Sequence, residues 1–439
     1  MSKLERYDSY KDSGVEWLKE VPMDWKMVRL GTLGKFSASG IDKYLVKNES
    51  IVKIINFTDI YSRTNLTLDS KISYMEVTTP ELNRKKHLVK KGDLIFLPSS
   101  ETFEDLGLSA LVNEELENTS FSYHLIRLEF EKDIEHNYRK YLSNNNSVLN
   151  QFSSYGKGTT RKIIGRSVFK NIRVLIPSKQ EQIKIASFLD TKTEQLDKAI
   201  KQKEQLIELL KERKQIVIND AVTKGVDKTV TMKDSGVEWI GEIPEHWEIV
   251  KSKRLFMARK ERARKSDLQL TASQKHGVIY QKDYMELEGR KVTQVETNYE
   301  ILKRVEPNDF LISMRSFQGG IEYCRYEGSV SSAYVPLIPI KDVVSEYFKY
   351  LFKSYVYIQA LASTSNLVRD GQALRFDNFS LVDLIIIPEH EQENIAKYLD
   401  EETVKIDKSI SLQEKQITKL KEYKTTLIDS VVTGKVRVR

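Results

Sequence analysis

A long helix-forming stretch occurs twice in this chain, and it limits the possible folds more than any other feature does. Residues 178–225 and 389–434 contain no proline, and each has glycine only at its last position. Taken at alternating spacings of three and four residues, each stretch yields a mainly apolar series over about four heptads, the pattern of a coiled coil. The series include Leu196, Ile200, Ile207, Leu210 and Val217 in the first stretch, and Ile406, Ile410, Ile417, Leu420 and Leu427 in the second.

The register of the two stretches distinguishes between two interpretations. One copy alone would favour an amphipathic helix packed on a globular core. Here the two series agree position by position at an offset of 210 residues, as in Ile207 and Ile417, and they agree at polar positions too. We therefore predict two long helices that pair with each other as a coiled coil. Ser178 and Glu181 form an S-x-x-E capping box, which predicts the start of the first helix.

A second repeat precedes each globular part of the chain. Residues 11–17 and 233–239 both read Lys-Asp-Ser-Gly-Val-Glu-Trp, at an offset of 222 residues. Large aromatic side chains dominate packing, so we expect these leaders to dock against a domain or the helix pair. The leaders and the residues just after them hold all the tryptophans of the chain, namely Trp17, Trp25, Trp239 and Trp247.

Together the repeats divide the chain into two halves of like design, an internal pseudo-twofold repeat. β-Rich runs predict strands at 51–55, 93–97, 124–128 and 337–340, and apolar periodicity predicts helices at 138–152 and 347–362. The predicted fold is α/β, with two α/β domains separated by a long two-helix coiled coil. Its parts are a leader at 1–25, a first domain at 26–176, a first helix at 177–225, a second leader at 226–247, a second domain at 248–387, and a second helix with a tail at 388–439.

Composition restricts the class of partner. The net charge is +7 and the charged fraction is 30%, a basic excess that is compatible with a polyanionic partner. Cys324 is the only cysteine, so no internal disulfide can form, and a cytosolic protein is the natural expectation. The first residues lack the apolar segment of a signal peptide, and no apolar run reaches transmembrane length. We therefore expect a cytoplasmic protein without a membrane segment.

No enzymatic constellation is present in the sequence. It contains no G-x-x-x-x-G-K-[S/T] phosphate loop, and the absence of any Pro-Pro pair excludes the Asn/Asp-Pro-Pro-Tyr cluster of amino-methyltransferases. The six histidines do not have metal-ligand spacing, so no metal site is predicted. Asp93 and Asp309 occupy matching places, each at the start of an apolar run. A structural carboxylate is commoner there than a nuclease carboxylate, and no catalytic residue is predicted.

Basic clusters in both globular segments are more informative, because arginine and glutamine pair bidentately with guanine and adenine edges. Any one cluster is most simply a solvated face, but clusters in both segments of a basic chain favour DNA binding. The candidates are Arg84, Lys85, Lys86, Lys157, Arg161 and Lys162 in the first segment, and Arg259, Arg262, Arg264, Lys265, Arg315, Gln318, Arg369 and Gln372 in the second.

The repeated motifs resemble those of specificity (S) subunits of type I restriction–modification systems. The leaders at 11–17 and 233–239 carry the resemblance, as do the helix ends Ala221-Val222-Thr223-Lys224-Gly225 and Val431-Val432-Thr433-Gly434-Lys435. The helix starts do so too, with one extra residue between Pro177 and Glu181 in the first. They read Ile176-Pro177-x-x-x-Glu181-Gln182-x-x-Ile185-Ala186-x-x-Leu189-Asp190 and Ile387-Pro388-x-x-Glu391-Gln392-x-x-Ile395-Ala396-x-x-Leu399-Asp400.

The resemblance implies a non-catalytic subunit with two target-recognition domains joined by an antiparallel helix pair, that is, a two-helix antiparallel coiled coil. Each domain would read one part of a split double-stranded DNA sequence. It also implies two modification (methyltransferase) subunits that bring S-adenosylmethionine, and through them restriction (translocase/endonuclease) subunits that use ATP and Mg²⁺ in phage defence. This chain would itself bind no cofactor. Two alternatives stay open: a catalytically silent coiled-coil scaffold with protein-binding domains, and a self-contained nuclease or methyltransferase.

Overall fold

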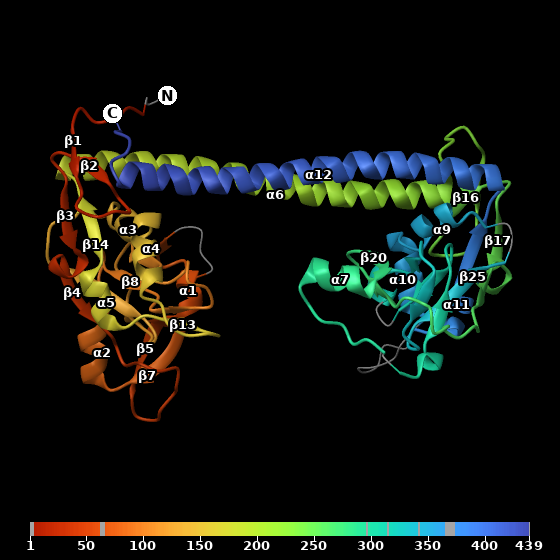
Figure 1. The fold of residues 1–439 in the computed structure, drawn as a ribbon, viewed down its shortest axis with the longest axis horizontal. Coiled ribbons are helices and arrows are strands. Elements are labelled where there is room, and N and C mark those ends of the chain that lie inside the picture. Colours follow the sequence, from red (N-terminus) through yellow and green to blue (C-terminus); the bar gives the residue numbers. More distant parts are fainter. Residues whose placement is uncertain are drawn as a thin grey trace. The chain divides into compact units, whose positions relative to one another are not determined.

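The computed structural model describes residues 4–61, 66–295, 297–313, 316–340, 343–364 and 374–438. The chain forms two compact units. Unit 1 contains residues 1–204 and 414–439, and unit 2 contains residues 205–413. Each unit is therefore built from one α/β segment and from parts of both long helices (Figure 1).

The long helices are α6 (Lys179–Lys224) and α12 (Glu389–Val432), and they pair antiparallel as predicted. In unit 1, Lys424 Nζ of α12 lies 2.7 Å from Asp197 Oδ1 of α6. In unit 2, Lys214 Nζ of α6 lies 2.7 Å from Asp407 Oδ2 of α12. Lys424 follows Lys214 by 210 residues, and Asp407 follows Asp197 by 210, so the two ion pairs occupy equivalent positions. The register read from the sequence therefore reappears as the same interhelical contact in each unit.

The capping box at the start of α6 is present. The Glu181 backbone N–H donates to Ser178 Oγ at 3.3 Å, and the Ser178 backbone N–H donates to Glu181 Oε2 at 3.3 Å. All the residues of the predicted helix seam are buried or half-buried. The buried ones are Ile200, Ile207, Ile406, Ile417 and Leu427, and the half-buried ones are Leu196, Leu210, Val217, Ile410 and Leu420.

Unit 1 contains a mixed sheet with strand order β4-β12-β8-β10-β6 and a smaller sheet with order β11-β5-β7. The strands of these sheets are β4 (Gly34–Ser37), β5 (Ser50–Ile55), β6 (Thr67–Leu68), β7 (Met75–Thr79), β8 (Leu94–Phe96), β10 (Ser109–Val112), β11 (Thr119–Phe121) and β12 (Ile126–Phe130). The paired strands outside them are β1 (Tyr10–Asp12) with β2 (Glu20–Pro22), β3 (Lys26–Arg29) with β14 (Arg173–Ile176), and β9 (Ser99–Ser100) with β13 (Lys162–Ile163). The short helices are α1 (Phe57–Tyr61), α2 (Glu81–His87), α3 (Arg139–Ser143), α4 (Asn146–Ser154) and α5 (Arg166–Asn171), with a 3-10 turn η1 (Leu30–Thr32).

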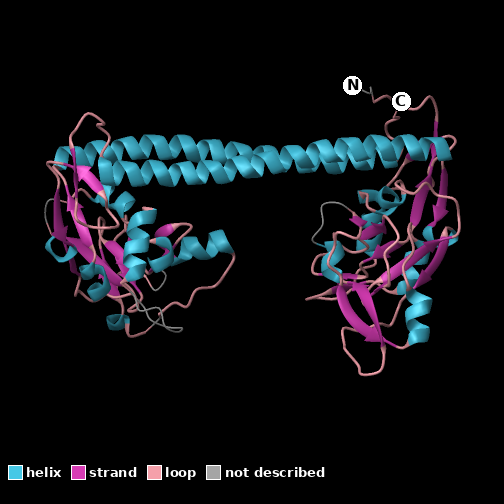
Figure 2. Ribbon diagram, turned by 180° about the vertical axis from the view of Figure 1, so that it is seen from behind, coloured by secondary structure: helices cyan, strands magenta, loops and turns pink. Residues whose placement is uncertain are grey.

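Unit 2 follows the same outline, with a sheet of strand order β18-β25-β22-β23. Its strands are β15 (Met232–Asp234), β16 (Glu242–Pro244), β17 (Glu248–Lys251), β18 (Phe256–Ala258), β19 (Leu270–Ser273), β20 (Gly277–Tyr280), β21 (Lys303–Val305), β22 (Phe310–Ile312), β23 (Glu322–Tyr323), β24 (Gly328–Val330), β25 (Val335–Pro339) and β26 (Asp383–Ile386). Its short helices are α7 (Gln281–Glu288), α8 (Ser316–Gly319), α9 (Ser345–Leu351), α10 (Tyr355–Ser363) and α11 (Phe376–Leu381), with 3-10 turns η2 (Ser252–Arg254) and η3 (Tyr299–Ile301). Figure 2 shows the mixture of strands and short helices within each unit.

The helix predicted at 138–152 is wrong in one respect, because two helices, α3 and α4, stand in its place. The Asn145 side chain accepts a hydrogen bond from the Val148 backbone N–H and starts α4. Asparagine caps a helix better than it continues one, which explains the break. Unit 2 has the same break between α9 and α10, where the Ser354 side chain accepts from the Tyr357 backbone N–H.

The leader of each unit packs against the start of a long helix, as predicted, although not all four tryptophans take part. Trp25 is fully buried and its Nε1 donates to Glu181 Oε1 of α6 at 3.4 Å. Trp247 is equally buried and donates to Glu391 Oε2 of α12 at 3.0 Å. Trp17, by contrast, is 47% exposed. The second tryptophan of each leader therefore fixes the leader to the start of a long helix.

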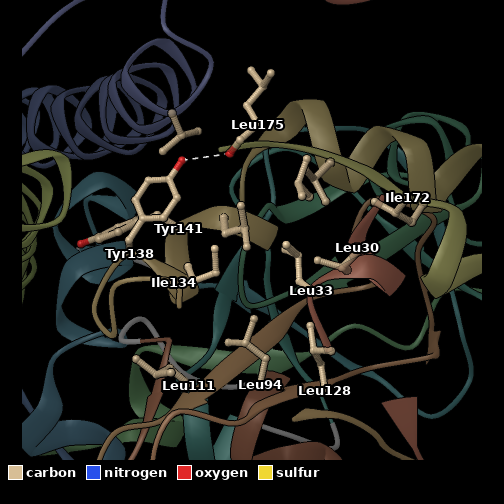
Figure 3. Close-up of a cluster of buried hydrophobic side chains, with 14 of the residues drawn as sticks. Leu30, Leu33, Leu94, Leu111, Leu128, Ile134, Tyr138, Tyr141, Ile172 and Leu175 are labelled. Carbon is tan, nitrogen blue, oxygen red and sulfur yellow. Dashed lines mark hydrogen bonds between the residues drawn. The ribbon is translucent and has the colours of Figure 1, made fainter. Parts of the chain in front are cut away.

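The core of unit 1 lies between its main sheet, α3, α4 and the long helices (Figure 3). Leu94 of β8 and Leu128 of β12 are fully buried in it. Tyr138 is also fully buried, and its hydroxyl donates to the Leu175 carbonyl at 3.3 Å. The α/β segment and the long helices thus share one hydrophobic core within this unit.

A buried aspartate directly precedes an inner strand of the main sheet in each unit, β8 in unit 1 and β22 in unit 2. Asp93 Oδ2 accepts the Lys90 backbone N–H at 2.9 Å, and Asp309 Oδ2 accepts the Glu306 backbone N–H at 2.9 Å. Each carboxylate therefore closes the turn before its strand, which is a structural role. Burial raises the pKa of Asp93 to about 6 and also raises that of Asp309.

The arginine that faces this aspartate comes from a different strand in each unit. In unit 1, Arg127 of β12 lies 3.8 Å from Asp93, and the residue opposite it on β4 is Ser37. In unit 2, Arg259 after β18 holds Asp309 with Nε at 2.7 Å and Nη2 at 2.9 Å. The Arg259 backbone N–H donates to the Pro336 carbonyl. Pro336 is the equivalent of Arg127, because the residue that follows each of them, Leu337 or Leu128, pairs with the residue that follows the aspartate.

Candidate nucleic-acid interface

The loop between α4 and α5 carries three of the predicted cations of unit 1, Lys157, Arg161 and Lys162. Its ends are fixed, because Lys157 and Ile163 exchange backbone hydrogen bonds of 3.1 and 2.8 Å. Lys157 and Arg161 are exposed, and Lys162 is half-buried with its Nζ 4.7 Å from the centre of the Phe103 ring. The loop therefore presents positive charge on a rigid backbone.

Arg161 is held in a defined orientation. Its Nε donates to Ser99 Oγ at 3.1 Å, and its guanidinium carbon lies 5.1 Å from the centre of the Phe57 ring. The Phe57 ring in turn stacks on Tyr61 with ring centres 5.0 Å apart. This arrangement leaves the terminal Nη groups of an exposed arginine for a ligand, with no partner for them among the described residues.

Tyr123 and His124 lie near Arg161, and sequence reasoning missed both. They are exposed, and their ring centres are 3.6 Å apart. Burial lowers the pKa of His124, and the positive charges of Arg161 and Lys43 lower it further. The sequence predicted a strand at 124–128, whereas β12 begins at Ile126, so His124 was assigned to a strand and the turn was not recognised.

The cluster on α2 is mostly engaged within the protein. Arg84 forms two hydrogen bonds of 2.7 Å with the Glu81 carboxylate and one of 2.8 Å with Asn118 Oδ1. Lys85 lies 3.3 Å from the same carboxylate. The Arg84 guanidinium, followed by Ser50 and Lys85, lowers the pKa of Glu81 to about 2. Lys85 and Lys86 are both exposed, so these two members of the cluster remain accessible to a polyanion.

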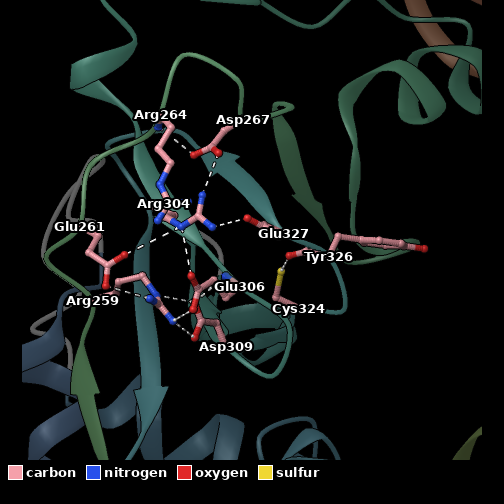
Figure 4. A network of polar contacts seen from close by, with 10 residues as sticks. All are labelled: Arg259, Glu261, Arg264, Asp267, Arg304, Glu306, Asp309, Cys324, Tyr326 and Glu327. Atoms are coloured by element: carbon pink, nitrogen blue, oxygen red, sulfur yellow. Dashed lines mark hydrogen bonds and ion pairs between the residues drawn. The ribbon is translucent and has the colours of Figure 1, made fainter.

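Arg259 departs from the DNA-contact prediction. It is buried, and besides Asp309 it lies 3.2 Å from Glu261 and 3.1 Å from Glu306 (Figure 4). A second buried arginine, Arg304, joins the same network through Glu306. Further partners of Arg304 are Asp267 and Glu327. The carboxylates around Arg259 satisfy its guanidinium, so its contribution is to the fold of unit 2.

The neighbouring cations have a different environment. Arg262, Arg264 and Lys265 are exposed in the loop that precedes β19. Lys265 also lines a hollow of about 450 Å³ in unit 2. The other residues around this hollow include Tyr280, Lys282, Gln294 and Tyr299. The lining of this hollow therefore combines cations, aromatic rings and amides with the carboxylates of Asp267 and Asp283.

The remaining predicted residues of unit 2 are Arg315, Gln318, Arg369 and Gln372. Gln318 is exposed on α8, which follows β22. Arg315, Arg369 and Gln372 lie outside the described residues. Residues 369 and 372 fall between α10 and α11, just as Lys157, Arg161 and Lys162 fall between α4 and α5. In the sequence, predicted DNA-contact residues therefore fall between the same pair of short helices in both halves.

Within the described parts of the chain, no group of three or more His, Cys, Asp or Glu side chains is arranged to hold a metal ion. In the same residues, no helix is long and apolar enough to cross a membrane. Cys324 is buried, its Sγ–H donates to the Tyr326 carbonyl at 3.2 Å, and burial raises the pKa of its thiol to about 11. A thiol with so high a pKa is a poor nucleophile at neutral pH.

The arrangement of paired helices and two α/β units defines a class of protein. A family model described as the type I restriction modification DNA specificity domain matches residues 22–209 and 244–422. These residues make up well over half of the chain, which therefore belongs to this family. It is a DNA specificity subunit of the type I restriction–modification kind, the non-catalytic member of an enzyme complex.

Relatives and solved structures agree with this assignment. The chain is 24% identical over 432 residues to a Methanocaldococcus jannaschii protein assigned as the MjaX specificity subunit of a type I restriction enzyme, covering 96% of this chain and 95% of that protein. It is 27% identical over 236 residues to the MjaVIII specificity subunit of the same organism, covering 54% and 50%.

Two solved structures share the fold. A chain in a structure concerned with complex assembly and conformational transition of the type I system matches with a TM-score of 0.70 at 16% identity, covering 94% of this chain and 99% of that one. The HsdS subunit of Thermoanaerobacter tengcongensis matches with a TM-score of 0.51 at 16% identity, covering 94% and 98%.

Proposed function

We propose that this subunit reads a bipartite double-stranded DNA target, with one part of the target read by unit 1 and the other by unit 2. The observation that supports this most strongly is the combination of a repeated framework with different loops. The aspartate turn, the leader tryptophan and the paired short helices recur in both units. The exposed residues between these elements differ, as two readers of different sequences require.

The contacts with DNA are assigned to the accessible cations and amides of each unit. In unit 1 these are Lys85, Lys86, Lys157, Arg161 and Lys162, and in unit 2 they are Arg262, Arg264, Lys265 and Gln318, with Arg315, Arg369 and Gln372 as further candidates. Arginine and glutamine in the major groove discriminate bases, whereas lysines on phosphate give affinity without sequence preference.

The long helices and the leaders are proposed to dock two modification subunits, which bring S-adenosylmethionine. Restriction subunits that use ATP and Mg²⁺ would join through that complex. In this proposal the subunit works in the cytoplasm, where it meets the host DNA. The rival function, a scaffold whose domains bind protein, predicts no DNA affinity and is tested by a gel shift at several salt concentrations.

The decisive experiment is methylation mapping in cells that express this chain with its modification subunit. The Gln318→Ala variant should relax the sequence requirement in one half of the target and leave the other half unchanged. A base contact is worth about 1–3 kcal/mol, so the relaxed position should tolerate other bases clearly. Equal loss in both halves would mean that Gln318 supports folding or assembly, and a wild-type target without two separate parts would refute the proposed function.

A further inference from the structure

Two parallel strands of unit 1 end beside each other at a candidate base-reading site. β5 and β11 run side by side in parallel, with Ile54 paired to Ser120 and Ile55 to Phe121. Phe57 follows the end of β5, and Tyr123 and His124 follow the end of β11. Ligands of α/β sheets bind beyond the carboxyl ends of parallel strands, because loops from neighbouring strands converge there. These three side chains are therefore placed together by topology.

Arg161 completes the site from a distant part of the sequence. Its guanidinium lies on the Phe57 ring, and its charge acts on His124. Lys43 acts on His124 as well, and the Tyr123 backbone N–H donates to Ile41 at 2.8 Å, which fixes the segment that carries Lys43. Aromatic rings, a histidine and cations from separate loops thus converge on one exposed area.

The strand ends also contain buried polar atoms that no described residue satisfies. Asn56 Oδ1 and Ser122 Oγ are buried and have no hydrogen-bond partner among the described residues. Asn56 directly precedes Phe57, and Ser122 directly precedes Tyr123. Buried polar atoms without partners are rare and point to water or a ligand nearby.

Unit 2 supplies an internal comparison. In unit 1, the turn at Ser122–Leu125 is closed by the Leu125 N–H, which donates to the Ser122 carbonyl at 2.9 Å. The turn at Ser331–Tyr334 of unit 2 is closed in the same way, by the Tyr334 N–H and the Ser331 carbonyl at 3.1 Å. The framework of the turn is therefore the same. The two residues at its tip are Ser332 and Ala333, where unit 1 has Tyr123 and His124.

The geometry points to Arg161, Tyr123 and His124 as the residues that determine which bases unit 1 accepts, with Arg161 on a guanine edge and the Tyr123–His124 tip on an adjacent base pair. This inference rests on the proposed function and deepens it. Arg161 suits guanine because Ser99 and Phe57 fix its plane while its terminal Nη groups remain for the O6 and N7 acceptors. An arginine fixed in advance loses little entropy on binding, so its contact discriminates well.

The test uses the full chain with its modification subunit and reads the methylated target across a genome. Arg161→Ala should relax one guanine position in the half-site of unit 1 by about 5- to 150-fold, the range expected of a single base contact. The double variant Tyr123→Ser, His124→Ala, which installs the tip of unit 2, should change the requirement at a neighbouring position. Arg166→Ala is the matched control, since Arg166 is an exposed arginine of the same unit that lies outside the site.

Each outcome decides the inference. A change confined to the half-site of unit 1, with Arg161→Lys less discriminating than wild type and all variants melting within about 1 °C of it, supports the assignment. An unchanged target, or an equal fall of methylation in both half-sites, overturns it. The proposed function is judged separately by the wild type and by Gln318→Ala, so those results identify which of the two ideas has failed.

Discussion

The buried carboxylate of Asp93 allows a direct test of the framework of unit 1. The Asp93→Asn substitution keeps an oxygen that can accept the Lys90 N–H but removes the charge. In the native protein, burial raises the pKa of Asp93 to about 6 from its ordinary 3.8, against the smaller opposing effects of the Lys90 N–H and Arg127. Between these two values the folded protein binds a proton that the unfolded chain releases.

The sign of the effect follows from this difference. A raised pKa in the folded state stabilises the protein below the unfolded pKa, and the stabilisation is lost as the pH rises through about 6. A difference of about two units corresponds to roughly 3 kcal/mol. The unfolding free energy of unit 1 in wild type, relative to Asp93→Asn, should therefore be larger at pH 4 than at pH 7 by about that amount. This is the reverse of the usual acid destabilisation by carboxylates.

The measurement must isolate unit 1, because unfolding of the whole chain would combine the two units. Denaturant-dependent hydrogen exchange of peptides that cover β8 and β12 reports the opening of unit 1 alone. Asp309→Asn is the control, since it alters the same turn in unit 2 and should leave these peptides unchanged. A difference between wild type and Asp93→Asn that is independent of pH, or that grows as the pH rises, would refute the reasoning and mean that Arg127 dominates.

Two further predictions concern the helices and the cations. Ile207→Asp places a charge on the buried face of α6 and should lower the unfolding free energy of unit 2 by about 3 kcal/mol or more. Leu209→Asp, at a site that is 61% exposed, should change it by less than about 0.5 kcal/mol. Equal effects of the two variants on the hydrogen exchange of α6 peptides would contradict the seam. Joint substitution of the exposed Arg262, Arg264 and Lys265 by alanine should flatten the salt dependence of DNA affinity. Arg259→Ala should leave the salt dependence unchanged and destabilise unit 2 by about 3–5 kcal/mol. The reverse pattern in salt-dependent binding would return Arg259 to the interface.

The features that the sequence predicted well are those that local spacing determines. The seam of α6 and α12 was readable because heptad periodicity directly encodes which face of a helix is buried. The aspartate turns were readable because an aspartate before an apolar strand closes its own turn. The break between α3 and α4 was missed, since the apolar period continues across Asn144 and Asn145 and conceals their capping.

The candidate site was only partly predictable, because its members meet through tertiary packing. Arg259 and Arg262 belong to one basic cluster in the sequence, yet the first is buried against Asp309 and the second is exposed. Arg161 was identified as a cation, but its contact with Phe57 joins residues about a hundred positions apart. The turn tip at Tyr123 and His124 acquires its meaning only beside these residues.

The buried arginine comes from a different strand in each unit, and this limits which segments can be exchanged between the units. Arg127 stands opposite Ser37 in unit 1, and Arg259 stands opposite Pro336 in unit 2, so each cross-strand pair supplies one arginine to one carboxylate. A hybrid that takes β4 from unit 1 and the strand beside it from unit 2 would combine serine with proline, and its aspartate would be buried without a cation. The opposite hybrid would crowd two arginines onto one aspartate. Functional chimaeras should therefore transfer the two strands together, whichever recognition loops they are meant to carry.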